Sequence, residues 1–430
     1  MLHIENDSVK KHILEGNFGL EKESLRVLEN GAFSHTPHPF PEDGHIVKDF
    51  CENQTEINTS VHNSPEGALE ELKYHNERIY KKLQSLPARE YLWMFSNPPY
   101  IENERDIPVA VFGGAQASKS AYRDYLSEKY GRYKMAFSGI HVNFSFSDAL
   151  LQADYEMEKR SDNFRYYKDR VYLDLAEKMA LCGWILVAAT AASPVLDSSF
   201  VEKGIYDRDV FSGMASVRCS EMGYWNEFTP ILHYENIDAY VKSIRNYVDK
   251  GLLKAPSELY YPIRLKPRGE NSLERLQSLG VDHLELRMFD LNPLAESGVD
   301  ERDILFAQLL MVWLASTPEG GFSQKDQIHA VQNFKNAARY DLKTVKIITP
   351  EGESHSVAHT ALTVIQQMQE FYGKMGPDVG PNMKAALDYQ YDKFVDAENR
   401  YAWKIRKQFS DGFVKKALAY AKERQEKKYV

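Results

Sequence analysis

Three segments of the chain alternate between apolar and polar residues with a period of two, which is the pattern of a β-strand with one buried face. They are residues 19–27, 138–146 and 283–289. Each has one apolar face and one face of chemically capable groups. A solvated surface strand shows the same alternation, so each segment alone leaves both interpretations open. The polar residues in question are Glu21 and Glu23; His141, Asn143 and Ser145; and His283, Glu285 and Arg287.

Longer stretches carry the spacing of helices. Pro65–Leu83 is expected to be a helix, with Ser64 as its N-cap and Pro65 at its first position. Further strands are expected at residues 217–228 and 260–265. Strands and helices without a regular βαβ rhythm predict an α+β fold. The other expected helices are Ala121–Tyr130, one or two within residues 162–192, Arg302–Ala315, Gln327–Tyr340, Ser356–Tyr372 and a long charged tail, Met383–Lys428.

A fourth segment, residues 49–56, adds more carboxylates. Glu52 and Glu56 share one parity and Asp49 has the other, so a bend between Asp49 and Glu52 is needed to aim both acids at one place. With His141, the acids of several strands offer the oxygen-rich ligands that suit Mg²⁺ or Mn²⁺ rather than zinc. Spacing this dispersed does not by itself define a metal site, and charged strands at a sheet edge are the alternative.

Composition narrows the class of protein. The 430 residues are 43% hydrophobic and 27% charged, which is ordinary globular usage and excludes wholesale disorder. The net charge of −9 argues against nucleic acid as a partner. Three scattered cysteines fit a reducing cytosol, so we expect a cytoplasmic protein. Residues 179–196 carry no charge, yet their Gly, Ser, Thr and Pro content favours a buried helix over a membrane span.

Basic residues lie between the acidic segments. Arginines among carboxylates suggest phosphate bridged by metal ions, although most such residues taken singly are surface charges. The sequence contains neither a P-loop nor a GxGxxG motif, so a nucleotide would have to bind on the sheet through metals. The basic residues are Arg123, Arg132, Lys134, Arg218, Arg264, Lys266, Arg268 and Arg287.

Five motifs, in this order, resemble those of the bacterial glutamate–cysteine ligases, and in particular the ligase module of the bifunctional glutathione synthetases. They are GLEKESLRV, SGIHVNFSF, SVRCSEMGYWN, ELYYPIRLK and HLELRMFDLNP, spread from about residue 17 to about residue 315. The resemblance implies a glutamine-synthetase-like fold, in which a curved, mostly antiparallel sheet forms a funnel with helices outside. It implies that residues 1–430 are a single catalytic domain, mainly helical from about 300 to 430, without an ATP-grasp domain.

The resemblance also implies the reaction. ATP would phosphorylate the γ-carboxylate of glutamate, and the amine of cysteine would displace phosphate to give γ-glutamylcysteine, the first step of glutathione biosynthesis. The substrates are small molecules, with ATP as co-substrate and two or three Mg²⁺ or Mn²⁺ ions per site. A homo-oligomer is left open, and a membrane is not expected as a partner.

Roles for individual residues follow from the matched motifs. Arg287 is expected to contact the transferred phosphate, and Arg218 the glutamyl group or its phosphate. Arg264 is expected near the nucleotide, together with Arg287. The implied metal ligands are Glu21, Glu23, Asp49, Glu56, His141 and Glu285. The implied substrate-binding residues are Tyr122, Arg123, Tyr224 and Tyr260, with both Tyr224 and Tyr260 on the cysteine side.

Two departures from the family pattern leave the amine open. Glu56 is followed by Ile-Asn-Thr-Ser where relatives tend to have Thr-Pro, and residues 294–298 read Leu-Ala-Glu-Ser-Gly where relatives have Phe-Ser-Pro-Ile-Gly. A sister ligase that couples glutamate to another amine is therefore the alternative. A non-catalytic relative is less favoured, because every matched acid is present.

Overall fold

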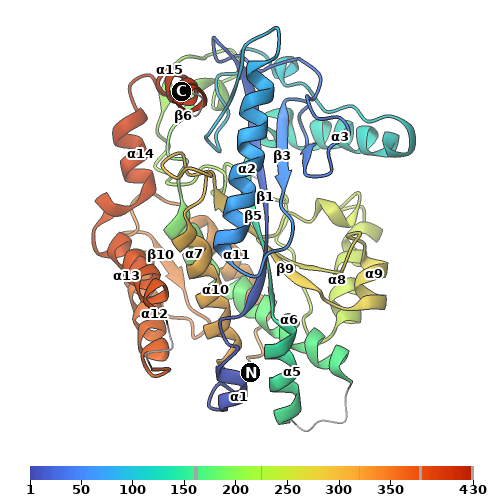
Figure 1. Cartoon of the computed structure of the whole chain (residues 1–430), viewed down its shortest axis with the longest axis vertical. Coiled ribbons are helices and arrows are strands. Elements are labelled where there is room, and N and C mark those ends of the chain that lie inside the picture. The colour runs from blue at the N-terminus through green and yellow to red at the C-terminus, as the bar shows by residue number, and fades with distance from the viewer. Residues whose placement is uncertain (159–162, 224, 319, 377–379, 428–430) are drawn as a thin grey trace.

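The computed structural model describes residues 1–158, 163–223, 225–318, 320–376 and 380–427. Its centre is an antiparallel sheet with the strand order β2-β3-β1-β5-β9-β8, and β4 pairs with the far end of β1 (Figure 1). Two small two-stranded sheets, β6-β7 and β10-β11, lie apart from it in the strand pairing. The strands are β1 (Gly16–Leu28), β2 (Ile46–Lys48), β3 (Gln54–Asn58), β4 (Glu90–Leu92), β5 (Gly139–Phe146), β6 (Leu196–Asp197), β7 (Asp209–Val210), β8 (Ile263–Lys266), β9 (His283–Asp290), β10 (Lys346–Ile348) and β11 (Ser354–Ser356).

Helices pack around this sheet, and α12, α13 and α14 lie along one side of the molecule (Figure 1). Helix α2 contacts β1, β3 and β4, while α6 packs against β8 and β9, α7 packs against β9, and α10 packs on α6 and α7. The helices are α1 (Asp7–Lys10), α2 (Pro65–Gln84), α3 (Ala117–Tyr130), α4 (Arg132–Met135), α5 (Asp148–Glu158), α6 (Phe164–Cys182), α7 (Trp184–Thr190), α8 (Ile237–Asp249), α9 (Leu273–Leu279), α10 (Glu301–Ala315), α11 (Gln324–Ala337), α12 (Val357–Gly373), α13 (Pro381–Val395), α14 (Tyr401–Phe409) and α15 (Phe413–Lys427).

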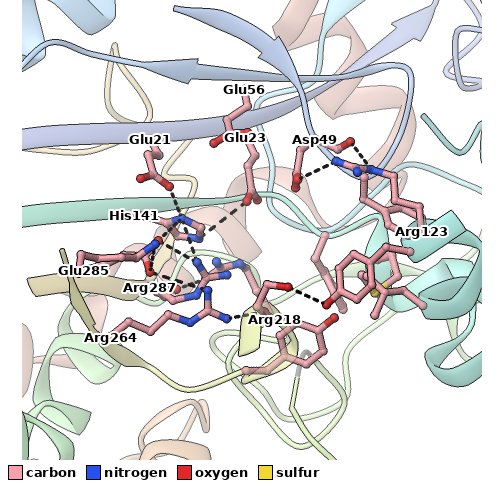
Figure 2. Close-up of a pocket in the computed structure, with 18 residues that line it drawn as sticks. Glu21, Glu23, Asp49, Glu56, Arg123, His141, Arg218, Arg264, Glu285 and Arg287 are labelled. Atoms are coloured by element: carbon pink, nitrogen blue, oxygen red, sulfur yellow. Dashed lines mark hydrogen bonds and ion pairs between the residues drawn. The ribbon is translucent and has the colours of Figure 1, made fainter. Parts of the chain in front are cut away.

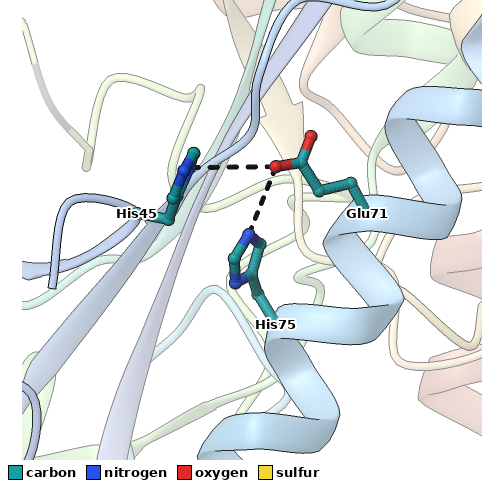
Figure 3. A group of neighbouring side chains, drawn as sticks. All are labelled: His45, Glu71 and His75. Carbon is teal, nitrogen blue, oxygen red and sulfur yellow. Dashed lines mark hydrogen bonds and ion pairs between the residues drawn. The ribbon is translucent and has the colours of Figure 1, made fainter.

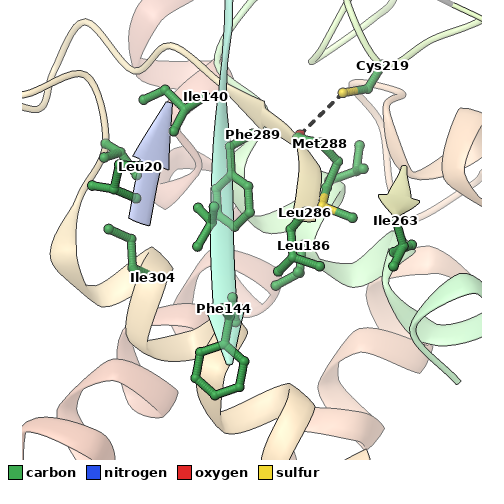
Figure 4. Close-up of a cluster of buried hydrophobic side chains, with 14 of the residues drawn as sticks. Leu20, Ile140, Phe144, Leu186, Cys219, Ile263, Leu286, Met288, Phe289 and Ile304 are labelled. Carbon is green, nitrogen blue, oxygen red and sulfur yellow. Dashed lines mark hydrogen bonds between the residues drawn. The ribbon is translucent and has the colours of Figure 1, made fainter. Parts of the chain in front are cut away.

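The apolar faces predicted from the alternation form the core between the sheet and the helices. Figure 4 shows side chains of β1, β5 and β9 meeting Leu186 of α7 and Ile304 of α10. These residues are almost completely buried. Because side chains alternate across a strand, burying this set turns the neighbouring polar residues to the opposite face. The strand residues in Figure 4 include Leu20, Ile140, Phe144, Leu286 and Phe289.

The register of the strands decides which polar groups meet. Glu21 lies opposite His141 across β1 and β5, and Glu23 lies opposite Glu56 across β1 and β3. Lys22 points to the other face of β1, where its ammonium group donates to Asn76 of α2 at 2.7 Å. Helix α2 therefore covers the face of β1 that is turned away from the acids.

Several sequence predictions are confirmed. The fold is α+β, and α2 begins at Pro65 with the Ser64 hydroxyl accepting from the Gly67 amide at 3.1 Å. The uncharged stretch at residues 179–196 ends α6 and forms the buried α7. None of the helices in the described part of the chain is long and apolar enough to cross a membrane.

Other predictions are wrong. In the described part of residues 217–228 the chain forms successive turns instead of a strand, because the hydroxyls of Ser216 and Ser220 bond backbone groups within a few residues. The strand expected to begin at residue 260 begins at Ile263. The tail is three helices instead of one, and its last break contains Asp411 and Gly412, both with positive φ.

Candidate active site

An open pocket of about 270 Å³ lies on the polar face of the main sheet (Figure 2). Its walls come from the five strands β1, β3, β5, β8 and β9, from α3, and from loops. Twelve of the thirteen predicted site residues line it, and Tyr224 lies outside the described residues. The twelve are Glu21, Glu23, Asp49, Glu56, Tyr122, Arg123, His141, Arg218, Tyr260, Arg264, Glu285 and Arg287.

One group of metal-ligand atoms is centred on His141. Its Nδ1 lies 2.8 Å from a carboxylate oxygen of Glu21 and 3.5 Å from one of Glu285. Ligand atoms of these three residues all lie within 4.8 Å of one another. Asn143 donates to the other oxygen of Glu21 at 2.9 Å and so orients that carboxylate. The group offers two oxygens and one nitrogen to an ion.

The pKa values of this group follow from burial and from neighbouring charge. Burial lowers the pKa of His141, and the positive charge of Arg287 lowers it further. Burial raises the pKa of Glu285, but Arg287 and Lys266 outweigh it and hold that pKa well below the usual range. A neutral imidazole beside an ionised carboxylate is the state in which both residues bind metal.

A second acidic group joins β1, β3 and the loop before β3. Glu23 and Glu56 are direct cross-strand partners, and like charges in that position destabilise a sheet. Burial and the nearby Asp49 raise the pKa of Glu23 to about 8, and the same two causes raise the pKa of Glu56 well above its ordinary value. Three acids in such proximity favour a proton or a cation between them.

The chain turns slightly later than the sequence predicts. Glu52 and Asn53 form the turn, in which the Gln54 amide donates to the Cys51 carbonyl at 3.0 Å, and β3 then begins. The turn brings Asp49 and Glu56 to one pocket. Glu52 does not line that pocket, and instead it pairs with Lys48 at 2.8 Å.

Two arginines lie close to the ends of β5 and β9. Arg218 donates to the Arg287 carbonyl at 2.9 Å, and its guanidinium lies against the backbone of Gly139. A Cβ atom at residue 139 would overlap that guanidinium, so the first residue of β5 has to be glycine for Arg218 to reach the pocket. Arg287 donates to Glu285 at 2.9 Å.

Two tyrosines, Tyr122 and Tyr260, also line the pocket. Tyr122 of α3 accepts a hydrogen bond from Ser257 at 3.2 Å, and the ring of Tyr260 meets that of Tyr130 edge-on at 5.3 Å. The fully buried Glu258 joins the segment before Tyr260 to α3, because its carboxylate accepts hydrogen bonds from Lys129 and from Tyr130. Arg264 donates to the Ser257 carbonyl at 2.9 Å, so the same short segment positions it.

Sequence reasoning did not assign several residues that line the pocket. Lys266 lies 3.2 Å from Glu285 and shares its strand face with Arg264, and this parity was readable from the sequence. The apolar lining residues carry no signal that separates them from core residues. The apolar lining residues are Phe50, Leu126, Met135 and Phe137, and the polar Ser257 also lines the pocket.

Comparison with known proteins gives one family. The family model for glutamate–cysteine ligase matches residues 1–252 and 230–337. The glutathione biosynthesis bifunctional protein GshAB of Listeria innocua is 32% identical over 432 residues, which covers 97% of this chain and 55% of that protein. The GshAB protein of Clostridium perfringens is 32% identical over 380 residues, or 85% of this chain and 48% of that protein. The chain thus spans about half the length of these relatives.

Two solved structures share the fold. A bifunctional glutathione synthetase from Pasteurella multocida has a TM-score of 0.84 at 24% identity, covering 99% of this chain and 54% of that chain. A glutamate–cysteine ligase from Francisella tularensis, in complex with AMP, has a TM-score of 0.83 at 23% identity, covering 96% and 89%. The predicted fold class is confirmed by this likeness.

Proposed function

The chain belongs to the glutamate–cysteine ligase family, and from that premise we propose that it joins the γ-carboxylate of glutamate to the amine of L-cysteine at the cost of ATP. The observation that carries this proposal is one pocket that combines five carboxylates and a histidine with several arginines. Carboxylates suit divalent cations, and arginines suit phosphate and carboxylate groups. The product would be γ-glutamylcysteine.

The residues of the pocket fit a divalent cation. Nε2 of His141 is buried and has no hydrogen-bond partner among the described residues, and a carboxylate oxygen of Glu23 lies 3.8 Å from it. Such an atom beside an opposed pair of acids favours an ion in the pocket. Oxygen-rich ligands favour Mg²⁺ or Mn²⁺, and the predicted number is two or three ions. The proposed ligands are Glu21, Glu23, Asp49, Glu56, His141 and Glu285.

The proposed chemistry is phosphoryl transfer followed by acyl transfer. An oxygen of the glutamate γ-carboxylate attacks the γ-phosphorus of ATP, the bond to the bridging oxygen breaks and ADP leaves. The cysteine amine then attacks the acyl carbon, phosphate leaves and the amine loses its proton. Bound divalent ions would neutralise the phosphate oxygens. Arg287 would hold the transferred phosphate and Arg218 the glutamyl group or its phosphate.

The walls around the arginines suggest where the other groups bind. Arg264 and Arg287 would contact the nucleotide, and Tyr122, Arg123 and Tyr260 the amino acids. A smaller cavity of about 50 Å³, lined by residues that include Cys219 and Trp225, shares Arg218, Tyr260 and Arg287 with the main pocket. Its size and apolar walls support an amine substrate with a small side chain.

The proposal extends to the cellular location and the partners of the enzyme. Three free thiols among the described residues support a cytoplasmic location, where thiols stay reduced. The net charge of −9 supports small-molecule partners over nucleic acid. A homo-oligomer stays a prediction.

The test is ADP release from Mg-ATP and glutamate with a panel of amines, with the product identified by mass spectrometry. Release that requires cysteine and yields γ-glutamylcysteine would support the proposal. Release only with another amine would keep the ATP and glutamate half and reassign the chain as a sister ligase. Absence of release with every amine, while ATP still binds, would overturn catalysis.

A further inference from the structure

A second cluster of ligand-type side chains lies away from the pocket, where α2 meets the residue before β2. Glu71 and His75 are four residues apart on α2 and therefore share one side of the helix. His45 directly precedes β2, and its ring stacks on that of His75 at 4.9 Å. Figure 3 shows both rings directed at the carboxylate of Glu71. None of the three lines the active-site pocket.

We propose that His45, Glu71 and His75 form a binding site for a divalent transition metal ion, for which Zn²⁺ is the probe. Each residue offers one ligand atom, and these atoms lie within 4.8 Å of one another. Oε1 of Glu71 is 3.3 Å from Nε2 of His75 and 3.8 Å from Nδ1 of His45. Ligand bonds of 2.0–2.2 Å at tetrahedral angles place ligand atoms about 3.4 Å apart, so little movement is needed.

The chemical types of the three ligands indicate which metal ion the cluster prefers. Two imidazoles and one carboxylate suit Zn²⁺ and its neighbours, whereas Mg²⁺ prefers oxygen ligands alone. This distinguishes the cluster from the carboxylate-rich pocket. The His45 side chain is 44% exposed, which leaves a path for the ion and a position for water. The donor set is that of a three-ligand zinc site with an open fourth position.

The protonation states suit metal binding at neutral pH. Burial raises the pKa of Glu71, but hydrogen bonds from His62 and Ser60 outweigh it and bring that pKa down to about 2. The carboxylate is therefore ionised without help from a metal. Burial lowers the pKa of His75, which keeps its imidazole neutral. His62 lies 2.6 Å from the second oxygen of Glu71 and orients it, as outer partners of metal ligands do.

Two contacts compete with the ion. Arg78 donates to Nδ1 of His75 at 3.0 Å, which places the proton of His75 on the nitrogen that faces Glu71. Metal at that nitrogen moves the proton to Nδ1, and Arg78 then keeps its ion pair with Asp43 alone. Nδ1 of His45 lies 2.8 Å from the Asn58 carbonyl oxygen. On metal binding the half-exposed ring gives up this contact, or the carbonyl becomes a further oxygen ligand of the ion. Removing Arg78 should therefore strengthen metal binding.

The experiment is calorimetric titration of the chelator-stripped full chain with Zn²⁺. The test variant is H45Q/H75Q. The matched control is H355Q/H359Q, which removes another pair of neighbouring histidines. Among the described residues these two histidines belong to no group of three ligand atoms within 4.8 Å of one another. A further variant, E285Q, is expected to weaken metal binding in the active-site pocket and not at the second cluster. We expect H45Q/H75Q to lose one Zn²⁺ equivalent, or at least about 10-fold in affinity, while the control and E285Q keep it.

Two further measurements keep the proposal falsifiable if H45Q/H75Q does not fold. The single variant H45Q changes a half-exposed residue and should weaken Zn²⁺ binding, while R78Q should strengthen it. Co²⁺ in the stripped chain should give the absorption bands of a tetrahedral site, and H45Q should remove them. Equal Zn²⁺ stoichiometry and affinity in every variant, or loss in E285Q alone, would overturn the proposal. Neither result depends on ligase activity, so the proposed function is tested separately.

Discussion

Glu23 and Glu56 face each other directly across the antiparallel strands β1 and β3, and Asp49 lies close enough to raise the pKa of both. A carboxylate pair in this register costs free energy whenever both members are ionised and nothing positive lies between them. The chain keeps the pair on the face of the sheet that forms the pocket. The cost is consistent with a site that is completed by cations.

Removing divalent metal should make the stability of the protein fall as pH rises. The pKa of Glu23 is about 8 in the folded chain against an ordinary 4.5, so the folded state binds the proton more tightly than the unfolded state. The stabilisation is complete below about pH 4.5 and is lost as pH rises towards 8, at no more than about 1.4 kcal/mol per pH unit. The measurement is the melting temperature against pH in chelator, with saturating Mg²⁺ as the comparison. E23Q should flatten the chelator curve, and an unchanged slope in E23Q would contradict the assignment.

Gly139→Ala should reduce turnover by displacing Arg218. The added methyl group would overlap the Arg218 guanidinium, which has to move away from the start of β5. Overpacking of this kind costs about 1–3 kcal/mol, so melting temperature and steady-state ADP release should both fall. Gly44→Ala is the control, because its Cβ would meet nothing within 4 Å and its φ is unexceptional. Wild-type turnover in G139A would show that Arg218 does not need its present position.

Much of the fold and the composition of the site could be predicted from sequence. Alternation on three strands placed Glu21, Glu23, His141, Glu285 and Arg287 on polar faces, and the structure gathers all five in one pocket. This works because burying one face of a strand fixes where every second residue points. The functional roles of these residues came from the family motifs and stay predictions.

The failures have physical causes that short-range patterns do not contain. Residues 217–228 look strand-like, but serine hydroxyls bond the backbone locally and the chain turns around Arg218. Lys266 was given no role, although its parity on β8 matches that of Arg264, because its proximity to Glu285 depends on the pairing of β8 with β9. The pairing of Glu23 with Glu56 depends on the register between β1 and β3, which no local pattern specifies.

Glu21→Gln should abolish turnover and leave the fold intact. The substitution keeps the shape that Asn143 and His141 contact, but it removes the charge that a metal ligand needs. We expect ADP release to fall by more than about 100-fold, or about 3 kcal/mol in activation free energy. Glu66→Gln, on the exposed first turn of α2, is the control. Calorimetry should show weaker Mn²⁺ binding in E21Q, and full turnover in E21Q would remove Glu21 from the metal site.

Tyr260→Ala should raise the KM for cysteine more than the KM for glutamate. Tyr260 lines the pocket, and its backbone amide donates to the Asn226 side chain at 2.8 Å, so truncating the ring leaves the segment attached. We expect a rise of about 10-fold in the KM for cysteine, equivalent to about 1.4 kcal/mol of binding, with a change of less than about 2-fold for glutamate. The measurement is initial rates of ADP release with each amino acid varied in turn at saturating Mg-ATP.

Tyr74→Ala, on the exposed face of α2, controls for loss of a tyrosine elsewhere. Equal changes in the two KM values would assign Tyr260 to the shape of the whole pocket instead of the cysteine side, and a selective rise for glutamate would reverse the proposed arrangement of the two substrates.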